Sequence, residues 1–249
     1  MTLDPHNADA HAAQSYLYGQ RDWDWNRAEL ELKTAIAEDP GNSIGHRWYR
    51  YILHQKGRTE EALEQARLAL KTDPASVTLI KIYASDLARD KHYTEAISTF
   101  KEALDFDPND AGVHFGLADS YDKAGNLDLA PPELEKGYRL SGETEIADQF
   151  HRDLKRFGYQ KSAEAARRFN LERQVRELKT KSALGNYVSP TAYVYVYADL
   201  HDKENTLKWL EAAYGADAHV MVELRDEKFD FVRQEPRFQK IWGNVPFSH

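Results

Sequence analysis

Residues 96–108 read AISTFKEALDFDP, and residues 62–74 and 28–40 carry the same pattern as ALEQARLALKTDP and AELELKTAIAEDP. The three segments lie 34 residues apart. In each one, apolar or small residues recur at the first, second, fifth, eighth and ninth positions, with the polar Glu29 as the one exception. This spacing defines one face of an α-helix. The closing proline lacks an amide donor and ends the helix. The pattern therefore predicts one helix of a repeating unit, ending at Asp-Pro.

A second helix is predicted upstream of each of these segments, joined to it by a tight turn. Gly57 and Gly125 mark the turn two periods apart, and Lys91 occupies the same slot between them. The apolar residues of this other helix include Trp48, Tyr49 and Leu53 in one unit and Leu117, Ala118 and Tyr121 in another. A helix pair this small cannot bury its apolar faces alone, so the pairs must stack on one another. We therefore expect an all-α solenoid.

The period, the small and aromatic slots and the closing Asp-Pro together resemble the tetratricopeptide repeat family over residues 8–142. The resemblance implies a superhelix of stacked antiparallel helix pairs that holds a protein or peptide. Four such units are expected in residues 1–142. In the fourth unit Pro131-Pro132 falls at the start of the second helix and Gly142 replaces the closing proline. Because proline is tolerated in a first helical turn, we expect a late or kinked start there.

The remainder of the chain continues the pattern less regularly. Residues 143–188 predict a degenerate fifth unit whose second helix is long and basic, running from about Lys161 to Leu184. Residues 189–249 predict a last unit and a capping tail, so that the whole chain forms one continuous solenoid domain. The alternation Tyr-Val-Tyr-Val-Tyr at 193–197 is also typical of a strand, but the helical stripe after it favours a helix. Five tail residues are expected to cover the last helix pair: Phe231, Val232, Phe238, Ile241 and Trp242.

The tail and the turn at Asp22-Trp23-Asp24-Trp25 also resemble repeat regions at the C-terminal end of large bacterial signalling and transcriptional regulators. This resemblance implies a module of a larger protein and leaves the activity of that protein open. Leu3-Asp4-Pro5 is the expected end of a preceding repeat. An uncovered first helix pair then predicts self-association through the N-terminal end as a further alternative.

Composition excludes several classes of protein. The net charge is −8 and cysteine is absent, which argues against a general nucleic-acid binder and excludes thiolate chemistry, disulfides and Cys-based zinc sites. No stretch approaches the roughly 18 apolar residues that a membrane span needs. The N-terminal residues carry no secretory pattern, so the cytoplasm is the default compartment.

Catalytic, metal and cofactor motifs are not found. The ten histidines form no His-Glu-x-x-His pattern; the nearest pair is His46 with His54, two turns apart, for which an ordinary half-buried role is preferred to a ligand role. No phosphate-binding glycine loop or nucleophile elbow occurs. The sequence thus predicts no cofactor and no catalysis. The alternative, an enzyme or small-ligand receptor, requires a closed cavity with a desolvated histidine or carboxylate.

Charge is unevenly distributed. Residues 152–181 contain ten Lys and Arg against four Asp and Glu. A solvated helix paired with acidic neighbours is the preferred interpretation, with docking of an acidic protein or of nucleic acid as alternatives.

In the resembled family, the first helices line the concave wall where a partner binds. Aromatic and basic side chains alternate there and suit a peptide with acidic residues. For the aromatic positions, packing between neighbouring first helices is the alternative. Tyr16 and Tyr51 occupy the slots where a carboxylate clamp of the chaperone-binding branch would place Asn, which argues against such a clamp. The expected wall residues are Tyr16, Arg47, Tyr51, His54, Gln55, Lys81, Ser85, Arg89, Phe115, Asp119 and Asp122.

Overall fold

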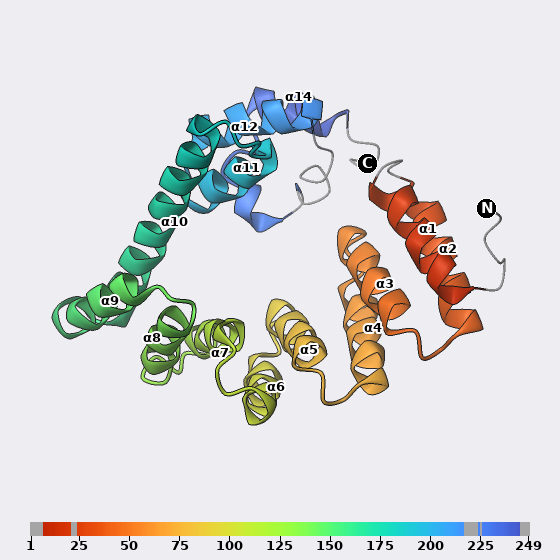
Figure 1. Cartoon of the computed structure of the whole chain (residues 1–249), viewed down its shortest axis with the longest axis horizontal. Coiled ribbons are helices and arrows are strands. Elements are labelled where there is room, and N and C mark those ends of the chain that lie inside the picture. Colours follow the sequence, from red (N-terminus) through yellow and green to blue (C-terminus); the bar gives the residue numbers. More distant parts are fainter. Residues whose placement is uncertain (1–6, 21–23, 217–223, 225, 245–249) are drawn as a thin grey trace. The chain divides into compact units, whose positions relative to one another are not determined.

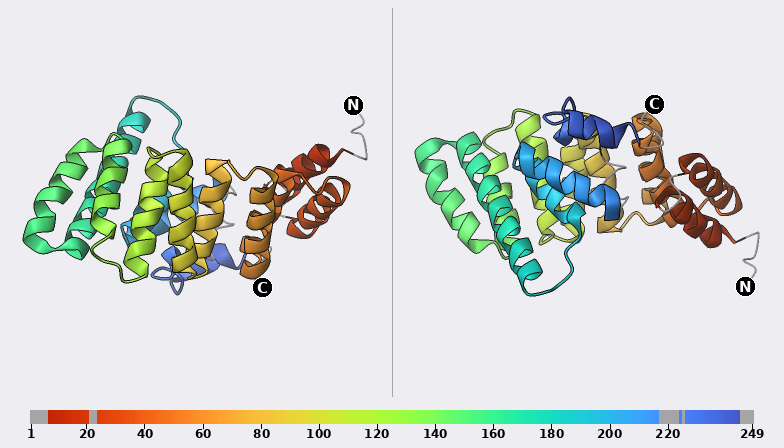
Figure 2. Two further views of the ribbon diagram at one scale, coloured as in Figure 1. Left: turned by 90° about the horizontal axis from the view of Figure 1, so that it is seen from below. Right: turned by 90° about the horizontal axis from the view of Figure 1, so that it is seen from above.

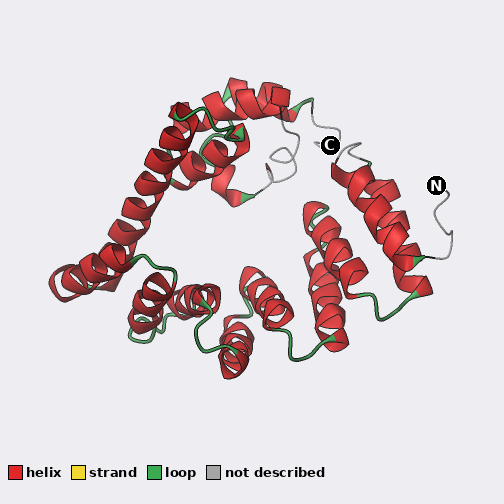
Figure 3. Cartoon of the chain, viewed as in Figure 1, coloured by secondary structure: helices red, strands yellow, loops and turns green. Residues whose placement is uncertain are grey.

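A computed structural model describes residues 7–20, 24–216, 224 and 226–244. Within these residues the secondary structure is helical throughout, and no strand occurs (Figure 3). The expectations on Leu3-Asp4-Pro5 and Asp22-Trp23 fall outside the described residues. Contacts between Cα atoms divide the chain into two compact units, Met1–Ala166 and Arg167–His249, with the boundary inside one long helix. The prediction of one continuous solenoid domain stays a prediction.

Unit 1 consists of helix pairs that follow the 34-residue period (Figure 1). In the first four pairs the two helices pack on each other, and each second helix packs on the first helix of the next pair. Figure 2 shows successive helices from yellow to green side by side. The elements are α1 (Ala8–Gln20), α2 (Trp25–Glu38), α3 (Ser43–Gln55), α4 (Thr59–Thr72), α5 (Val77–Arg89), α6 (Tyr93–Phe106), α7 (Ala111–Lys123), α8 (Ala130–Leu140) and α9 (Thr144–Phe157), followed by the start of α10 (Tyr159–Ala183).

Local sequence signals set the helix ends. The aspartates of the Asp-Pro pairs, Asp39, Asp73 and Asp107, are the C-terminal cap residues of α2, α4 and α6. The next helix then begins at a polar cap: the Asn42 side chain accepts from the Gly45 amide, which satisfies one of the donors left over at a helix start. The Asp-Pro motif therefore ends one helix and positions the start of the next.

Small residues allow the helices to approach closely. The alanines of the repeated stripe have 0–1% of their surface exposed, among them Ala28, Ala62, Ala96 and Ala103. Gly116 on α7 lies against the ring of Phe100 on α6; a Cβ added to Gly116 would come within 2.4 Å of that ring. The contact between these two helices thus requires a residue without a side chain at position 116.

Replacing Gly116 by Ala is expected to lower the free energy of unfolding by about 1–3 kcal/mol, measured by urea denaturation. Phe100 is 1% exposed and has no room to withdraw, so the strain exceeds the helix propensity that Ala gains. The same substitution in a Phe100→Leu background should cost less, because the smaller side chain leaves space. Equal costs in the two backgrounds would contradict the predicted clash.

Three expectations on the less regular units are confirmed. Helix α8 begins late, at Ala130, with Pro131 and Pro132 in its first turn. The second helix of the fifth unit is long, Tyr159–Ala183. Residues 193–197 are helical, within α11 (Pro190–Asp199). The predicted turn positions are also confirmed: Lys91, with a φ of 65°, adopts the left-handed backbone conformation of Gly57 and Gly125, whose φ values are 71° and 80°.

Unit 2 contains the last helix pair and its cap. After the end of α10 come α11, α12 (Lys203–Ala216), the short 3₁₀ helix η2 (Glu227–Phe229) and α14 (Pro236–Trp242). Helix α14 packs on α12, and η2 packs on α11. The cap residues Val232 and Phe238 are 0% exposed and Ile241 is 5% exposed, while Arg237 bridges Glu204 and Glu211 of α12. The tail therefore caps the last helix pair, as the sequence predicts.

Candidate partner-binding surface

The first helices of the first four pairs, α1, α3, α5 and α7, are called here the first-helix row. Helix α1 contacts α3, and α5 contacts α7, so neighbouring first helices lie against each other. The predicted wall residues all lie on this row. Their surroundings differ, and the differences decide which of them are available to a partner.

An aromatic cluster joins α1 to α3. The ring of Tyr16 meets that of Trp48 edge-on, with 5.1 Å between centroids, and Trp48 meets Tyr51 at 6.0 Å. Tyr51 also lies 6.3 Å from Trp25 of α2, which is buried. Tyr16 is 40% exposed, and Trp48 and Tyr51 are half-buried. The rings pack between first helices and keep part of their surface exposed. The packing interpretation therefore applies here, and binding of a partner by these rings stays a prediction.

Trp48 belongs to this cluster although the sequence did not assign it to the wall. The signal was present: Trp48 and Tyr51 are three residues apart and therefore neighbours on the helix surface. Arg47 is exposed beside them on α3. The cluster thus combines a cation with partly exposed aromatic surface.

His54 lies in a buried ion cluster between α3 and α5. Its Nε2 is 3.0 Å from Oδ1 of Asp86, and Arg50 donates to the same carboxylate at 2.9 Å. Asp86 is 2% exposed, and the side chain of His54 is 9% exposed. His54 therefore holds two first helices together. The sequence pattern did not reveal Asp86 or Arg50, because a carboxylate on an otherwise apolar face has no periodic signature.

Lys81 is also bound within the protein. Its Nζ lies 2.7 Å from Oδ2 of Asp110, the cap residue of α7, whose other oxygen accepts from the Val113 amide. Burial by itself raises the pKa of Asp110; the hydrogen bonds from Lys81 and from the backbone amides of Val113 and Gly112 outweigh it and lower the pKa. Lys81 thus joins α5 to the start of α7. Because its ammonium group already binds a carboxylate of the protein, we expect it to contribute little to the binding of a partner.

The ring of Phe115 packs within its own helix pair, against α8. Its ring lies 5.1 Å from that of Tyr138 on α8, and a Cβ added to Gly137 would come within 2.7 Å of it. The glycine creates the space that the ring occupies, so the packing interpretation holds for Phe115. Asp119 pairs with Lys123 one turn along α7, at 2.9 Å.

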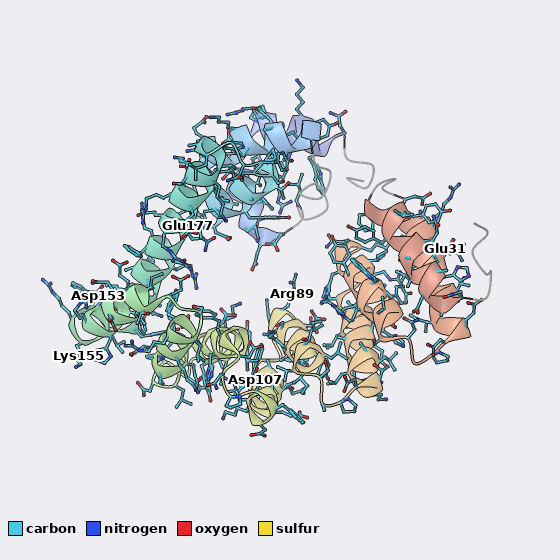
Figure 4. All side chains as sticks on the ribbon, viewed as in Figure 1. Glu31, Arg89, Asp107, Asp153, Lys155 and Glu177 are labelled. Atoms are coloured by element: carbon cyan, nitrogen blue, oxygen red, sulfur yellow. The ribbon has the colours of Figure 1, made fainter. Side chains whose placement is uncertain are left out.

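The remaining wall residues differ in exposure. Gln55 and Asp122 are half-buried, and the exposed Ser85 donates to the Lys81 carbonyl. Arg47 and Arg89 are exposed, and Figure 4 shows Arg89 at the end of α5, directed away from α6. The wall residues exposed in the structure are Tyr16, Arg47, Ser85 and Arg89.

The recurrent histidines have structural surroundings. His46 is 2% exposed, and its ring nitrogens lie 2.7 Å from Oε1 of Gln65 and 3.1 Å from the Pro40 carbonyl. Two units later, His114 contacts Glu133 and the carbonyl of the equivalent proline. His46 therefore does not share a surface with His54. Among the residues that the structure describes, no three or more potential metal ligands lie close enough to hold an ion.

A second buried ion cluster surrounds Glu29, the one polar residue in the apolar stripe of α2. Its carboxylate accepts from Lys56 at 2.5 Å, Arg58 at 2.7 Å and Tyr49 at 3.1 Å, and Lys33 lies at 2.8 Å. Burial by itself raises the pKa of Glu29, and the hydrogen bonds from the three cations outweigh it, so the pKa lies far below its usual value. Glu29 therefore joins α2 to the pair α3–α4 as a charged group.

The basic segment is partly paired along its own helix. Arg168 lies 3.0 Å from Glu172 and Arg173 lies 3.7 Å from Glu177, both one turn apart on α10. Both pairs lie within α10, so the predicted pairing of this segment with acidic neighbouring repeats stays a prediction. In the described part of the chain, no helix combines the length and apolar character needed to cross a membrane.

Known proteins are similar to this chain in two ways. Residues 12–77 and 87–136 match models of the tetratricopeptide repeat. A comparison with curated proteins finds no match. Among solved structures, MamA from Desulfovibrio magneticus RS-1 (residues 41 to the end) is 18% identical, with a TM-score of 0.53 over 66% of this chain and 92% of that chain. A second MamA structure is 17% identical, with a TM-score of 0.52 over 63% of this chain and 86% of that chain.

These structural likenesses concern the fold alone. The repeat matches coincide with the helix pairs, the capped turns and the alanine stripe described above. Repeats of this kind are non-catalytic in general and form extended surfaces that bind other proteins. The chain therefore contains tetratricopeptide repeats, which cover residues 12–77 and 87–136.

Proposed function

We propose that this protein–protein interaction scaffold binds an acidic peptide segment of its partner on the first-helix row, at the surface formed by Tyr16, Arg47, Trp48 and Tyr51. The observation that carries the proposal is the aromatic cluster, which is partly exposed and has an exposed arginine beside it. Arg89 on α5 adds a second exposed cation to the same row.

The chemistry of these groups favours a carboxylate-bearing partner with apolar residues. Tyr, Trp and Arg are the residue types that dominate interface energetics. Tyr and Trp do so because they offer large contact areas with few rotatable bonds. Arginine holds a carboxylate through two parallel hydrogen bonds. His54 and Lys81, which already bind carboxylates inside the protein, are expected to contribute little.

We further propose that the scaffold is a module of a larger bacterial signalling or regulatory protein. The support is the resemblance of its cap and of the turn before α2 to repeat regions of such proteins. The capping tail itself packs on α11 and α12. The open reading frame that encodes the chain tests this: an adjoining DNA-binding, kinase or cyclase domain is expected, and an adjoining metabolic enzyme would contradict it.

Selection from a random peptide display library tests the binding proposal. The peptides retained are expected to be enriched in Asp and Glu beside apolar residues and to be released by salt. Tyr16→Ala and Arg47→Glu should each weaken binding of a selected peptide by about tenfold or more, measured by fluorescence anisotropy.

The matched control is Lys71→Glu on α4, which reverses an exposed charge away from the first-helix row. It should leave the affinity unchanged within about twofold. Retention of neutral or basic peptides only, or equal losses in the control and in Arg47→Glu, would show that the surface lies elsewhere.

Self-association through the N-terminal pair stays a prediction. Leu17 on α1 is 40% exposed, whereas Ile52, which occupies the corresponding slot on α3, is 3% exposed. The sedimentation coefficient of Leu17→Glu, compared with that of the unmodified chain at high concentration, tests whether this face forms a contact between copies.

A further inference from the structure

Unit 2 contains a cavity of about 390 Å³ between α10, α11 and the start of α12. The volume lies within the range of small-molecule and side-chain binding sites. It is lined by Arg168, Glu172, Val175, Arg176, Lys179, Tyr197, Leu200, Asp202 and Asn205.

The α10 contribution is one continuous face of the helix. Residues 168, 172, 175, 176 and 179 recur at intervals of three and four positions, the spacing that places side chains above one another. Three of these five residues are cations. The cavity also has an apolar part, Val175 at 8% exposure and the half-buried Leu200.

Both carboxylates that line the cavity are already engaged. Glu172 is paired with Arg168 at 3.0 Å. Asp202 caps α12: its Oδ1 accepts from the Asn205 amide at 3.1 Å, and its Oδ2 accepts from the Asn205 side chain at 2.8 Å. Three cations against two carboxylates leave the lining with one positive charge in excess.

The two cations farther along the face carry that excess. Within the described residues, neither Arg176 nor Lys179 has a carboxylate partner, and both are exposed. The Arg176 guanidinium lies 5.9 Å from the centre of the Phe169 ring, a contact that does not use its N–H donors. These donors therefore remain available to an acceptor in the cavity.

Tyr197 adds a hydrogen-bonding group to the cavity. It is 5% exposed, it lines the cavity, and its ring stacks on that of Tyr193. Among the described residues its hydroxyl has no hydrogen-bond partner. Because Tyr197 lines the cavity, its hydroxyl can donate to an oxygen of a bound group.

We propose that this cavity binds a single carboxylate group that is joined to an apolar chain. One excess positive charge matches one carboxylate, two flexible cations and a tyrosine hydroxyl supply its hydrogen bonds, and Val175 and Leu200 contact the apolar part. An acidic side chain of a bound protein and a free monocarboxylic acid share this chemistry. The site is separate from the surface proposed above and does not depend on it.

Calorimetric titration of the full chain tests the site with three probes. The first is an end-blocked peptide with one Glu between leucines, the second is the same peptide with Gln, and the third is hexanoate. Binding of the Glu peptide without the Gln peptide assigns the site to an acidic partner segment; binding of hexanoate without either peptide assigns it to a free acid. Binding of none of the three, or equal binding of the Glu and Gln peptides, overturns the proposal.

Variants connect the binding to the cavity. Lys179→Gln and Arg176→Gln are each expected to weaken it by about tenfold or more, and Tyr197→Phe by a few-fold. The matched control is Lys181→Gln, an exposed cation of α10 outside the lining, which should bind like the unmodified chain. Tyr16→Ala should also leave the affinity of the cavity for the probe unchanged. If Lys181→Gln weakened binding as much as Lys179→Gln, the binding would depend on the net charge of the helix and not on the cavity. That result would overturn the proposal.

Discussion

Replacing Asp86 by Ala is expected to lower the free energy of unfolding by about 3–5 kcal/mol, the cost of breaking a buried ion pair from one side. Asp86 is 2% exposed and binds both Arg50 and His54 of the neighbouring first helix. Its removal leaves the Arg50 guanidinium, whose side chain is 21% exposed, without its carboxylate. The loss is therefore expected to exceed that of an ordinary surface pair.

Urea denaturation followed by circular dichroism measures this loss. The matched control is Asp119→Ala, which breaks a more exposed pair on a single helix, with side chains 44% and 48% exposed. Surface pairs of that kind contribute about 0.3–0.5 kcal/mol. A similar small loss for both variants would show that the cluster between α3 and α5 does not hold the repeats together.

Replacing Glu29 by Gln is expected to cost about 3 kcal/mol at neutral pH and progressively less in acid. The pKa of Glu29 in the folded protein lies far below its usual value, because the hydrogen bonds from three cations outweigh the opposite effect of burial. A group whose pKa is lowered on folding stabilises the protein fully above its unfolded pKa of about 4.3. That contribution is lost as the pH falls through the range between the unfolded and folded values.

Denaturation at a series of pH values separates this effect from general acid sensitivity. The difference in free energy between the unmodified chain and Glu29→Gln should be constant from neutral pH to about pH 5 and shrink below it. Glu64→Gln is the control, because Glu64 is exposed and its ion pair, in the described part of the chain, is with Arg67 of its own helix. A difference at Glu29 that does not change with pH would contradict a carboxylate held ionised by its neighbours.

The periodic features of this fold were predictable from the sequence. The spacing of the Asp-Pro pairs, the alanine stripe and the turn slots at Gly57, Lys91 and Gly125 predict the helix pairs of unit 1. They do so because each feature has a local cause: a missing amide donor, a small side chain, or a left-handed backbone. The late start of α8 was predictable for the same reason.

The candidate site was less predictable, because contacts between helices depend on single partners. His54 and Lys81 occupy wall slots, but Asp86 and Asp110 on the neighbouring helices bind them. Phe115 occupies a wall slot too, and the missing side chain of Gly137 lets its ring turn toward α8. A period of 34 residues predicts the position of a residue on its helix. It does not predict which side chain of a neighbouring helix that residue contacts.

Amide hydrogen exchange with a selected acidic peptide bound tests the central claim most directly. If the first-helix row binds the partner, the peptide should increase protection in α1 and α3, around Tyr16, Arg47 and Trp48, with a smaller increase at the end of α5. The second helices α4 and α6 should be unaffected. Protection confined to the second helices, or no change in α1 and α3 at saturating peptide, would contradict the account.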